Sequence, residues 1–406
     1  MIKTYRYRLQ TNSYQEAEID SQLEMHRYVY NKMLKQRIKI YKDKSISVTY
    51  NMQQRQLPLL KSNRIELLTC NAQALQETTR RLDETFQNFF EKIKNGERTG
   101  FPRFKSKKRF NSLRYSTGFK ITGNRIYISK IGTIKFHKSR DFKGELKKII
   151  VKRCGNKYYV SLVCEITDKP TKAEVKKMCG IDLGINQYVT TSDGAVIETK
   201  DDYTKRRDRL ALNQRRLSRK KMGSNNRKKA KLRVATCHEK ISNSRNDFLH
   251  KASFYLVKTY DLLVFEDLKI VNMTRRAQEN GVSQKSGLNR SILNMAWGKF
   301  LEYVTYKAEE AGKYVFKVNP QNTSKICSKC HHKNEGSLKK YRVYVCESCG
   351  HEMDRDWNSG TNVFDRFVDT VRHTEINACG ALTEKLKDMI CEYTISPRTS
   401  LMYVRV

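Results

Sequence analysis

Acidic residues are scarce in this sequence relative to basic ones. Lys and Arg number 81 against 42 Asp and Glu, which gives the 406-residue chain a formal charge of +39. A charge of this size destabilises a compact chain by self-repulsion unless a polyanion neutralises it. We therefore expect a nucleic acid as the principal partner.

Long apolar runs are absent as well. The sequence contains no run of about 18 apolar residues, so it predicts no membrane span. Residues 1–10, MIKTYRYRLQ, lack the apolar core of a secretory signal peptide. We therefore expect a cytoplasmic protein.

The cysteines do not suggest a disulfide framework. There are 11 of them, an odd number, and most are scattered, which suits a reducing compartment. Four form two C-x2-C pairs with the spacing C-x2-C-x15-C-x2-C, the pattern of a zinc ribbon. Four thiolates complete a tetrahedral zinc shell. The expected structural zinc ligands are Cys327, Cys330, Cys346 and Cys349.

The N-terminal part predicts a mixture of helices and strands. Residues 1–10 alternate tyrosine with basic residues, which is typical of a strand. Apolar residues at three- and four-residue steps predict helices over 14–96. Short alternating runs with turn pairs between them predict a small barrel or curled sheet over 112–168. If the first strand joins this sheet, the helical segment is an insertion.

The pattern changes at residue 178, where three strands are followed by helix, strand, helix, strand and helix. Residues 203–221 and 226–260 predict basic helices, residues 269–290 a flexible basic loop, and residues 291–312 a further helix. This order suits a ribonuclease-H-like fold, in which the first and fourth strands are neighbours.

Three acids follow this predicted order. Asp182 ends the first strand, Glu266 ends the fourth, and Asp356 lies near the start of the last helix. Three acids at one sheet edge repel one another, and two divalent cations resolve this while clamping a phosphodiester. Oxygen ligands suit Mg²⁺ or Mn²⁺. Asp267 should point to the opposite side of its strand, whereas Asp354 remains a competitor of Asp356.

Basic segments with interleaved aromatic residues predict nucleic-acid contacts. In GFPRFKSKKRF, residues 100–110, aromatic faces can stack on bases while cations bind phosphates. Residues 205–233 carry a dense basic run on helices with an apolar stripe, which favours a surface that follows phosphates. The expected contacts are Tyr5, Arg6, Arg103, Phe104, Lys105, Lys107, Lys108, Arg215, Arg216, Arg219, Lys220, Lys221, Arg227, Lys228 and Lys229.

Several motifs together resemble those of the TnpB family, transposon-encoded RNA-guided nucleases related to type V CRISPR effectors. They are YRYRL, GFPRFKSKKR, GIDLGI, SRKKMGSNNRKKAKLR, VFEDL, QNTSKICSKC and CESCGHEMDRDWNSGTNV. The resemblance covers nearly the whole chain. One departure is DWNSGTN after the ribbon, where the family often has D-x-N-A-A-x-N. Small residues are retained there, so we expect the close helix packing to be preserved.

The resemblance implies a mixed fold with α/β, all-β and all-α parts. A wedge β-barrel (1–10 and 110–172) would carry an inserted helical recognition lobe (11–109). A ribonuclease-H-like RuvC domain (173–320 and 354–380) would be split by a zinc ribbon (321–353), and 381–406 would be a C-terminal tail. Asp182, Glu266 and Asp356 would be the catalytic metal ligands.

The implied activity is cleavage of DNA matched to a bound guide RNA. The guide would derive from the end of the transposable element, and a short flanking motif in double-stranded target DNA would be read by the N-terminal part. We expect a monomer, and the resemblance implies a bacterial or archaeal cytoplasmic protein that is associated with the nucleoid when it is bound to DNA. Three other functions remain open: a guided DNA-binding regulator without cleavage, a transposase, and a zinc-ribbon RNA-binding protein with incidental acids.

Overall fold

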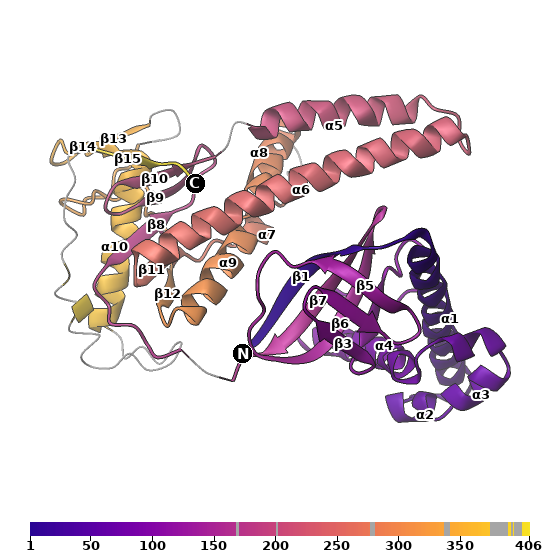
Figure 1. Cartoon of the computed structure of the whole chain (residues 1–406). Helices are drawn as coiled ribbons and strands as arrows, with labels where there is room; N and C mark the ends of the chain where they lie inside the picture. Colours follow the sequence, from indigo (N-terminus) through magenta and orange to yellow (C-terminus); the bar gives the residue numbers. More distant parts are fainter. Residues whose placement is uncertain are drawn as a thin grey trace. The chain divides into compact units, whose positions relative to one another are not determined.

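The computed structural model divides the chain into two compact units, Met1–Lys169 and Pro170–Val406. Figure 1 shows the helices and strands of both units. The structure describes residues 1–167, 170–199, 202–276, 281–336, 342–373, 389–390, 393 and 400–406.

The first unit is built on a seven-stranded antiparallel sheet with the order β2-β6-β7-β1-β5-β4-β3. Its strands are β1 (Ile2–Gln10), β2 (Ser112–Tyr115), β3 (Phe119–Thr122), β4 (Arg125–Ile128), β5 (Gly132–His137), β6 (Glu145–Cys154) and β7 (Lys157–Glu165). β1 lies between β7 and β5. The first strand therefore joins the sheet formed much later in the sequence, and β2 and β3 are its edges.

Five helical segments lie between β1 and β2. They are α1 (Ser13–Lys44), α2 (Tyr50–Gln54), α3 (Leu57–Ser62), the 3-10 helix η1 (Ile65–Thr69) and α4 (Ala72–Lys94). α1 begins at a capping box formed by Asn12 and Gln15, which satisfies backbone N–H groups at the helix start. It ends at Ser45, whose φ of 56° is left-handed. The helices thus form an insertion in the sheet order.

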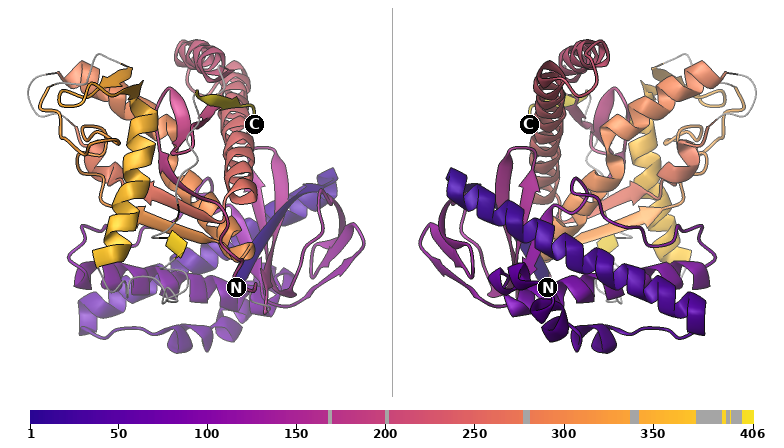
Figure 2. Two further views of the ribbon diagram at one scale, coloured as in Figure 1. Left: turned by 90° about the vertical axis from the view of Figure 1, so that its left-hand side faces the viewer. Right: turned by 90° about the vertical axis from the view of Figure 1, so that its right-hand side faces the viewer.

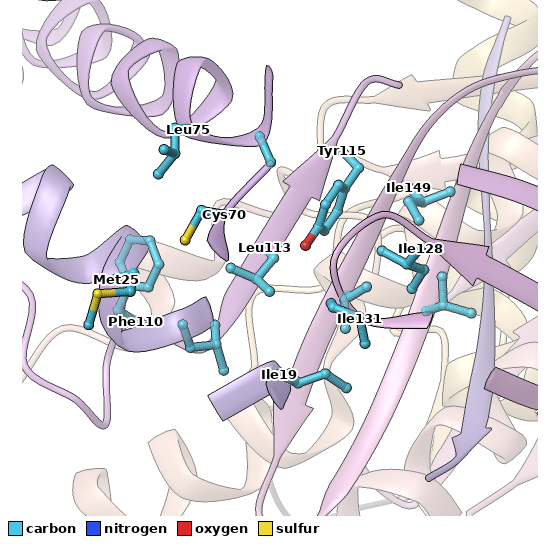
Figure 3. Close-up of a cluster of buried hydrophobic side chains, with 14 of the residues drawn as sticks. Ile19, Met25, Cys70, Leu75, Phe110, Leu113, Tyr115, Ile128, Ile131 and Ile149 are labelled. Carbon is cyan, nitrogen blue, oxygen red and sulfur yellow. The ribbon is translucent and has the colours of Figure 1, made fainter. Parts of the chain in front are cut away.

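Helices and sheet share one core in this unit. Figure 3 shows Ile19 of α1 and Leu75 of α4 gathered with Leu113 of β2, Ile128 of β4 and Ile149 of β6, all of them buried. Burial of such side chains is worth about 1.5–3 kcal/mol each. The helical insertion is therefore stabilised by the sheet on which it packs.

The second unit contains a six-stranded mixed sheet with the order β12-β11-β8-β9-β10-β15. Its strands are β8 (Met178–Asp182), β9 (Gln187–Thr191), β10 (Ala195–Glu198), β11 (Leu262–Glu266), β12 (Tyr314–Val318) and β15 (Met402–Val404). β8 and β11, the first and fourth strands of this unit in chain order, pair in parallel, which confirms the prediction that these two strands are neighbours. β15 pairs in parallel with β10, so the segment expected to be a tail contributes a strand.

Helices cover both faces of this sheet. α6 (Asn225–Thr259) and α9 (Trp297–Glu310) pack on the face that carries Ile181 and Phe265. α10 (Arg355–His373) packs on the face that carries Met178 and Val264 (Figure 2). Side chains alternate between the two faces along each strand. The residues that follow Ile181 and Phe265 therefore project toward the face covered by α10.

The remaining helices are α5 (Asp202–Ser218), α7 (Ile270–Met273) and α8 (Val282–Met295). α5 and α6 form an antiparallel hairpin (Figure 1). The prediction of a flexible loop over 269–290 is wrong, because α7 and most of α8 fall within it. The helical signal of α8 is weak because Ile292 is its buried position. The helix predicted over 291–312 is interrupted at Ala296, whose φ is 54°.

A small ribbon lies between β12 and α10. Its hairpin pairs β13 (Val343–Val345) with β14 (Glu352–Asp354) in antiparallel fashion. Tyr344 is fully buried beside Cys327 and Cys346. None of the helices in the described ranges is long and apolar enough to cross a membrane.

Candidate metal centres and nucleic-acid interface

Asp182 and Glu266 end two neighbouring parallel strands. The register pairs Phe265 of β11 with Ile181 of β8, so the next residue of each strand is an acid. Ile181 and Phe265 pack toward α6 and α9. By strand alternation, Asp182 and Glu266 project to the opposite face, where α10 lies.

α10 brings Asp356 to the same edge because its backbone approaches β8 unusually closely. A Cβ added to Gly180 would lie 2.3 Å from the Gly360 carbonyl oxygen and 2.6 Å from the Phe364 nitrogen. Ser359, which directly precedes Gly360 in α10, donates a hydrogen bond from Oγ to Asp182 Oδ1 at 3.0 Å. The small residues of DWNSGTN thus allow the close packing expected from the sequence.

Asp182 is half-buried, Glu266 and Asp356 are buried, and the three acids interact electrostatically. Glu266 and Asp356 are each 8% exposed. The pKa of Asp182 is raised well above its usual range by burial and by the negative charges of Glu266 and Asp356, against a lowering hydrogen bond from Ser359. Burial also raises the pKa of Glu266. An acid cluster of this kind is costly without a neutralising partner.

Asp356 is paired with two guanidinium groups. Arg342 Nη1 lies 2.8 Å from Asp356 Oδ2, and Arg355 Nη2 lies 3.2 Å from Oδ1. In the described part of the chain, only the four cysteines bring three or more ligand atoms within 4.8 Å of one another. The oxygens of the three acids are therefore spread more widely than that.

The two alternative acids have other contacts. Asp354 Oδ1 accepts hydrogen bonds from the backbone N–H of Asp356 at 2.9 Å and of Trp357 at 3.1 Å, the arrangement of a helix N-cap. Asp267 forms ion pairs with Lys269 and Lys317, and the hydrogen bond from Lys269 lowers its pKa. Neither carboxylate belongs to the cluster around Asp182.

The cysteines of the two C-x2-C pairs converge. Sγ of Cys327 lies 3.8 Å from Sγ of Cys349, and Sγ of Cys330 lies 3.5 Å from Sγ of Cys346. Four sulfurs around zinc at about 2.3 Å stand roughly 3.8 Å apart in a tetrahedron. The backbone N–H of Cys349 donates to Cys346 Sγ, which favours a thiolate. The donor set and its spacing fit zinc.

Sequence comparison places these features in a known family. A protein of Escherichia coli (strain K12) named "Putative RNA-guided DNA endonuclease InsQ" is 31% identical over 373 residues, covering 89% of this chain and 91% of that protein. A "Putative RNA-guided DNA endonuclease" of Streptomyces pristinaespiralis is 30% identical over 89% of this chain and 88% of its own length. "TnpB-like protein L79" of Acanthamoeba polyphaga mimivirus is 29% identical over 50% of this chain and 40% of its own.

The chain belongs to the TnpB family. Family models divide it further: "Probable transposase" matches residues 161–277, and "Cas12f1-like, TNB domain" matches 297–363. A "Helix-turn-helix domain" model matches residues 1–45. In this structure that range is the strand β1 followed by the single helix α1.

Solved structures show a weaker similarity. A "Cryo-EM structure of the Cas12f1-sgRNA-target DNA complex" is 18% identical, covers 89% of this chain and 98% of that chain, and has a TM-score of 0.33. A "Cryo-EM structure of CasPhi-2 (Cas12j) bound to crRNA" is 10% identical, covers 90% and 98%, and has a TM-score of 0.40.

Two of the aromatic residues expected to contact nucleic acid in this TnpB-family chain are buried instead. Tyr5 is 3% exposed in the core of the first unit, so its prediction as a contact is wrong. Alternation in β1 places Tyr5, Tyr7 and Leu9 inside, and Arg6 on the exposed face. Phe110, whose ring the sequence offered for stacking, is also buried. Both rings stabilise the core.

Other expected contacts are exposed to differing degrees. Arg6 lies with its guanidinium 3.9 Å from the centre of the Tyr159 ring. Phe104 is 52% exposed, whereas burial lowers the pKa of Lys105, whose backbone is hydrogen-bonded to Asn31. The exposed basic members of this set in the two loops and helices are Arg103, Lys107, Lys108, Arg215, Arg216, Arg219, Lys220, Lys221, Lys228 and Lys229.

Arg227 differs from its neighbours because it has a structural contact. Its Nη1 donates to the carbonyl oxygens of Leu217 at 3.0 Å and Lys220 at 2.7 Å. It therefore stabilises the end of α5 and the turn into α6.

Proposed function

We propose that this protein is an RNA-guided DNA endonuclease of a transposable element and that Asp182, Glu266 and Asp356 are its catalytic acids. The observation that carries the proposal is the convergence of the half-buried Asp182 with the buried Glu266 and Asp356 at one sheet edge, where desolvation and the charges of the other two acids raise the pKa of Asp182. Acidic side chains whose pKa is perturbed by desolvation and by neighbouring charges are often part of functional sites. Two relatives that each match 89% of this chain are named as RNA-guided DNA endonucleases.

The acids suit two cations better than one. Three carboxylates at one sheet edge repel one another, and a pair of divalent cations about 3.5–4 Å apart would neutralise them while clamping both the attacking and the leaving oxygen of a phosphodiester. Bound there, Mg²⁺ or Mn²⁺ would polarise the phosphodiester, generate the attacking hydroxide and stabilise the leaving oxygen. We assign Asp182 as the ligand shared by both cations, because burial and the charges of both Glu266 and Asp356 raise its pKa.

The protein's own residues orient these carboxylates. Ser359 fixes Asp182 by a hydrogen bond, and Thr323 Oγ1 does the same for Glu266. Asp354 begins α10 and so places Asp356 in the first turn of the helix. In this proposal, residues 173–320 and 354–380 form a RuvC-like nuclease domain, and the four cysteines of 321–353 hold a structural zinc.

Guide RNA and target DNA are the proposed partners. The formal charge of +39 requires a polyanion, and most of the expected contacts are exposed cations. Guide–target pairing would provide sequence specificity while the protein binds the heteroduplex through its backbone. We further propose that the guide derives from the element's end, that the first unit reads the short flanking motif, and that the protein acts as a monomer.

The test begins with RNA that co-purifies with the protein. We expect sequencing to yield a transcript that overlaps or follows the gene. A plasmid matched to its guide portion, with a randomised flank, should be linearised in Mg²⁺ and left intact in EDTA. Asp182→Ala should retain RNA binding and lose cleavage. Retained cleavage by that variant would contradict the assigned site.

A transposase is the second candidate, because the model matching residues 161–277 is described as "Probable transposase". The same acids could catalyse strand transfer. Joining of labelled element ends to a target plasmid by the protein, independent of RNA, would favour this candidate. Guide-dependent linearisation without joining would exclude it.

A further inference from the structure

A ladder of three side chains on α10 fastens the segment that leads from β12 into the ribbon. Asn358, Asn362 and Arg366 are spaced four residues apart, so they lie on one helix face. The segment they contact, residues 319–328, ends at the first cysteine pair.

The asparagines make four hydrogen bonds to this segment. Asn362 Nδ2 donates to the carbonyl oxygens of Thr323 at 2.8 Å and Ile326 at 2.6 Å. Asn358 Nδ2 donates to the Ile326 carbonyl oxygen at 2.8 Å, and its Oδ1 accepts from the Ser328 N–H at 3.0 Å. The ribbon is thereby joined to α10 immediately beside Cys327.

Arg366 extends the ladder by one turn. Its Nη1 donates to the carbonyl oxygens of Asn319 and Gln321, both at 2.6 Å. Asn358 is fully buried, Asn362 is 5% exposed and Thr323 is 2% exposed. Buried polar groups are costly when a partner is lost, so the segment has one preferred position.

That position decides where the Thr323 hydroxyl lies. Thr323 Oγ1 donates to the Glu266 carboxylate and also lies 3.2 Å from the Pro320 carbonyl oxygen. This hydrogen bond is one of the two influences that lower the raised pKa of Glu266, the other being the charge of Arg366. A continuous buried chain of contacts therefore runs from the first cysteine pair to a proposed catalytic acid.

We propose that Thr323, Asn358 and Asn362 are positioning residues through which the folded ribbon sets the orientation of Glu266 for divalent cations. The inference rests on the proposed function, and it adds a task for the zinc ribbon beyond its own stability. Mutation of a group that hydrogen-bonds to a metal ligand commonly weakens metal binding by about 10–100-fold.

The first test replaces the hydroxyl. Thr323→Val keeps the side-chain shape and removes the donor, whereas Thr323→Ser restores it. We expect Thr323→Val to keep its zinc content and RNA binding, while its affinity for Mn²⁺, measured by electron paramagnetic resonance without nucleic acid, falls about tenfold. Thr323→Ser should recover most of that loss. Thr361→Val is the matched control, because Thr361 Oγ1 donates within α10, to the Trp357 carbonyl oxygen.

The second test measures coupling to the ribbon. Zinc-depleted wild-type protein should also bind Mn²⁺ more weakly, and zinc depletion of Thr323→Val should cause no comparable further loss, because the connection is already broken. Unchanged Mn²⁺ affinity in Thr323→Val, or fully additive losses, would overturn the inference. Failure of the wild-type protein to cut guide-matched DNA in any divalent cation would instead contradict the proposed function. The comparison of Mn²⁺ affinities could still be interpreted, because it does not depend on cleavage.

Discussion

Arg342 Nη1 lies 2.8 Å from Asp356 Oδ2. Arg342 precedes β13 of the ribbon, and Asp356 lies in the first turn of α10. Together with Arg355, this guanidinium neutralises Asp356 in the cation-free protein. A divalent cation that binds Asp356 must therefore compete with Arg342, so the ribbon contacts the acid cluster on a second side.

Removal of Arg342 should strengthen cation binding in the absence of nucleic acid. The Arg342 side chain is 44% exposed, so its ion pair is screened by solvent and its effect is modest. We expect Arg342→Gln to raise Mn²⁺ affinity by roughly two- to fivefold, the size of a partly exposed ion pair. Isothermal titration of RNA-free protein measures this. Lys329→Gln, an exposed cation of the same ribbon, is the control and should leave affinity unchanged.

Asp354 and Asp356 should respond differently to the same substitution. Asparagine is a good N-cap residue, so Asp354→Asn should cut DNA at nearly the wild-type rate. Asp354→Ala should lose about 1 kcal/mol of stability through the missing cap while still cutting. Asp356→Asn should fold and fail to cut. Loss of cleavage in Asp354→Asn with activity in Asp356→Asn would reverse the assignment. Melting curves and plasmid cleavage measure both.

The raised pKa of Asp182 makes a prediction about stability. Because the folded-state pKa lies above the unfolded value, the metal-free protein loses stability as pH rises through the folded pKa. Asp182→Asn removes this cost and keeps an oxygen for Ser359. At neutral pH without divalent cations, we expect its Tm to exceed that of the wild type by about 2–4 °C, the shift for roughly 1 kcal/mol in a unit of this size.

Divalent cations should reverse that order. Mg²⁺ should raise the Tm of the wild-type protein at neutral pH and have little effect on Asp182→Asn. At a pH near the unfolded value of the carboxyl group, the metal-free difference between the two proteins should disappear. An Asp182→Asn protein that is less stable than the wild type in EDTA at neutral pH would refute this account of the cluster.

The α5–α6 hairpin should contribute to the salt dependence of RNA binding. Arg215, Arg216 and Arg219 are exposed. Replacing all three by glutamine should reduce the slope of log K against log salt by about 2 for a single-stranded RNA, close to 0.7 per phosphate contact. Arg227→Gln should mainly lower stability, because Arg227 binds backbone carbonyl groups. Filter binding over a salt series distinguishes the two, and an unchanged slope in the triple variant would exclude the hairpin.

Features specified by local sequence were predictable. The spacing of the four cysteines predicted a cluster that the structure contains. The chain order predicted that Asp182 and Glu266 end neighbouring strands, as they do. The alternation in β1 also carried a usable signal, since Tyr5 and Arg6 cannot face the same side of a strand. Only Arg6 of this pair faces outward and is available for a nucleic-acid contact.

Features that depend on distant partners were not predictable in the same way. β15 is a strand because it pairs with β10, some 200 residues earlier in the sequence. α8 exposes most of its length and has one buried position, so its apolar pattern is weak. Thr323 and Arg342 meet Glu266 and Asp356 only in the folded chain. The asparagines of DWNSGTN, four residues apart, were the one sequence signal of the ladder on α10.

The measurement that tests the central claim most directly is cleavage of a plasmid matched to the co-purified RNA, by wild-type protein and by Asp182→Ala at equal RNA occupancy. The account predicts Mg²⁺-dependent linearisation by the wild type and an intact plasmid with Asp182→Ala. Equal linearisation by both proteins, or cutting that persists in EDTA, would contradict a nuclease site built on Asp182, Glu266 and Asp356.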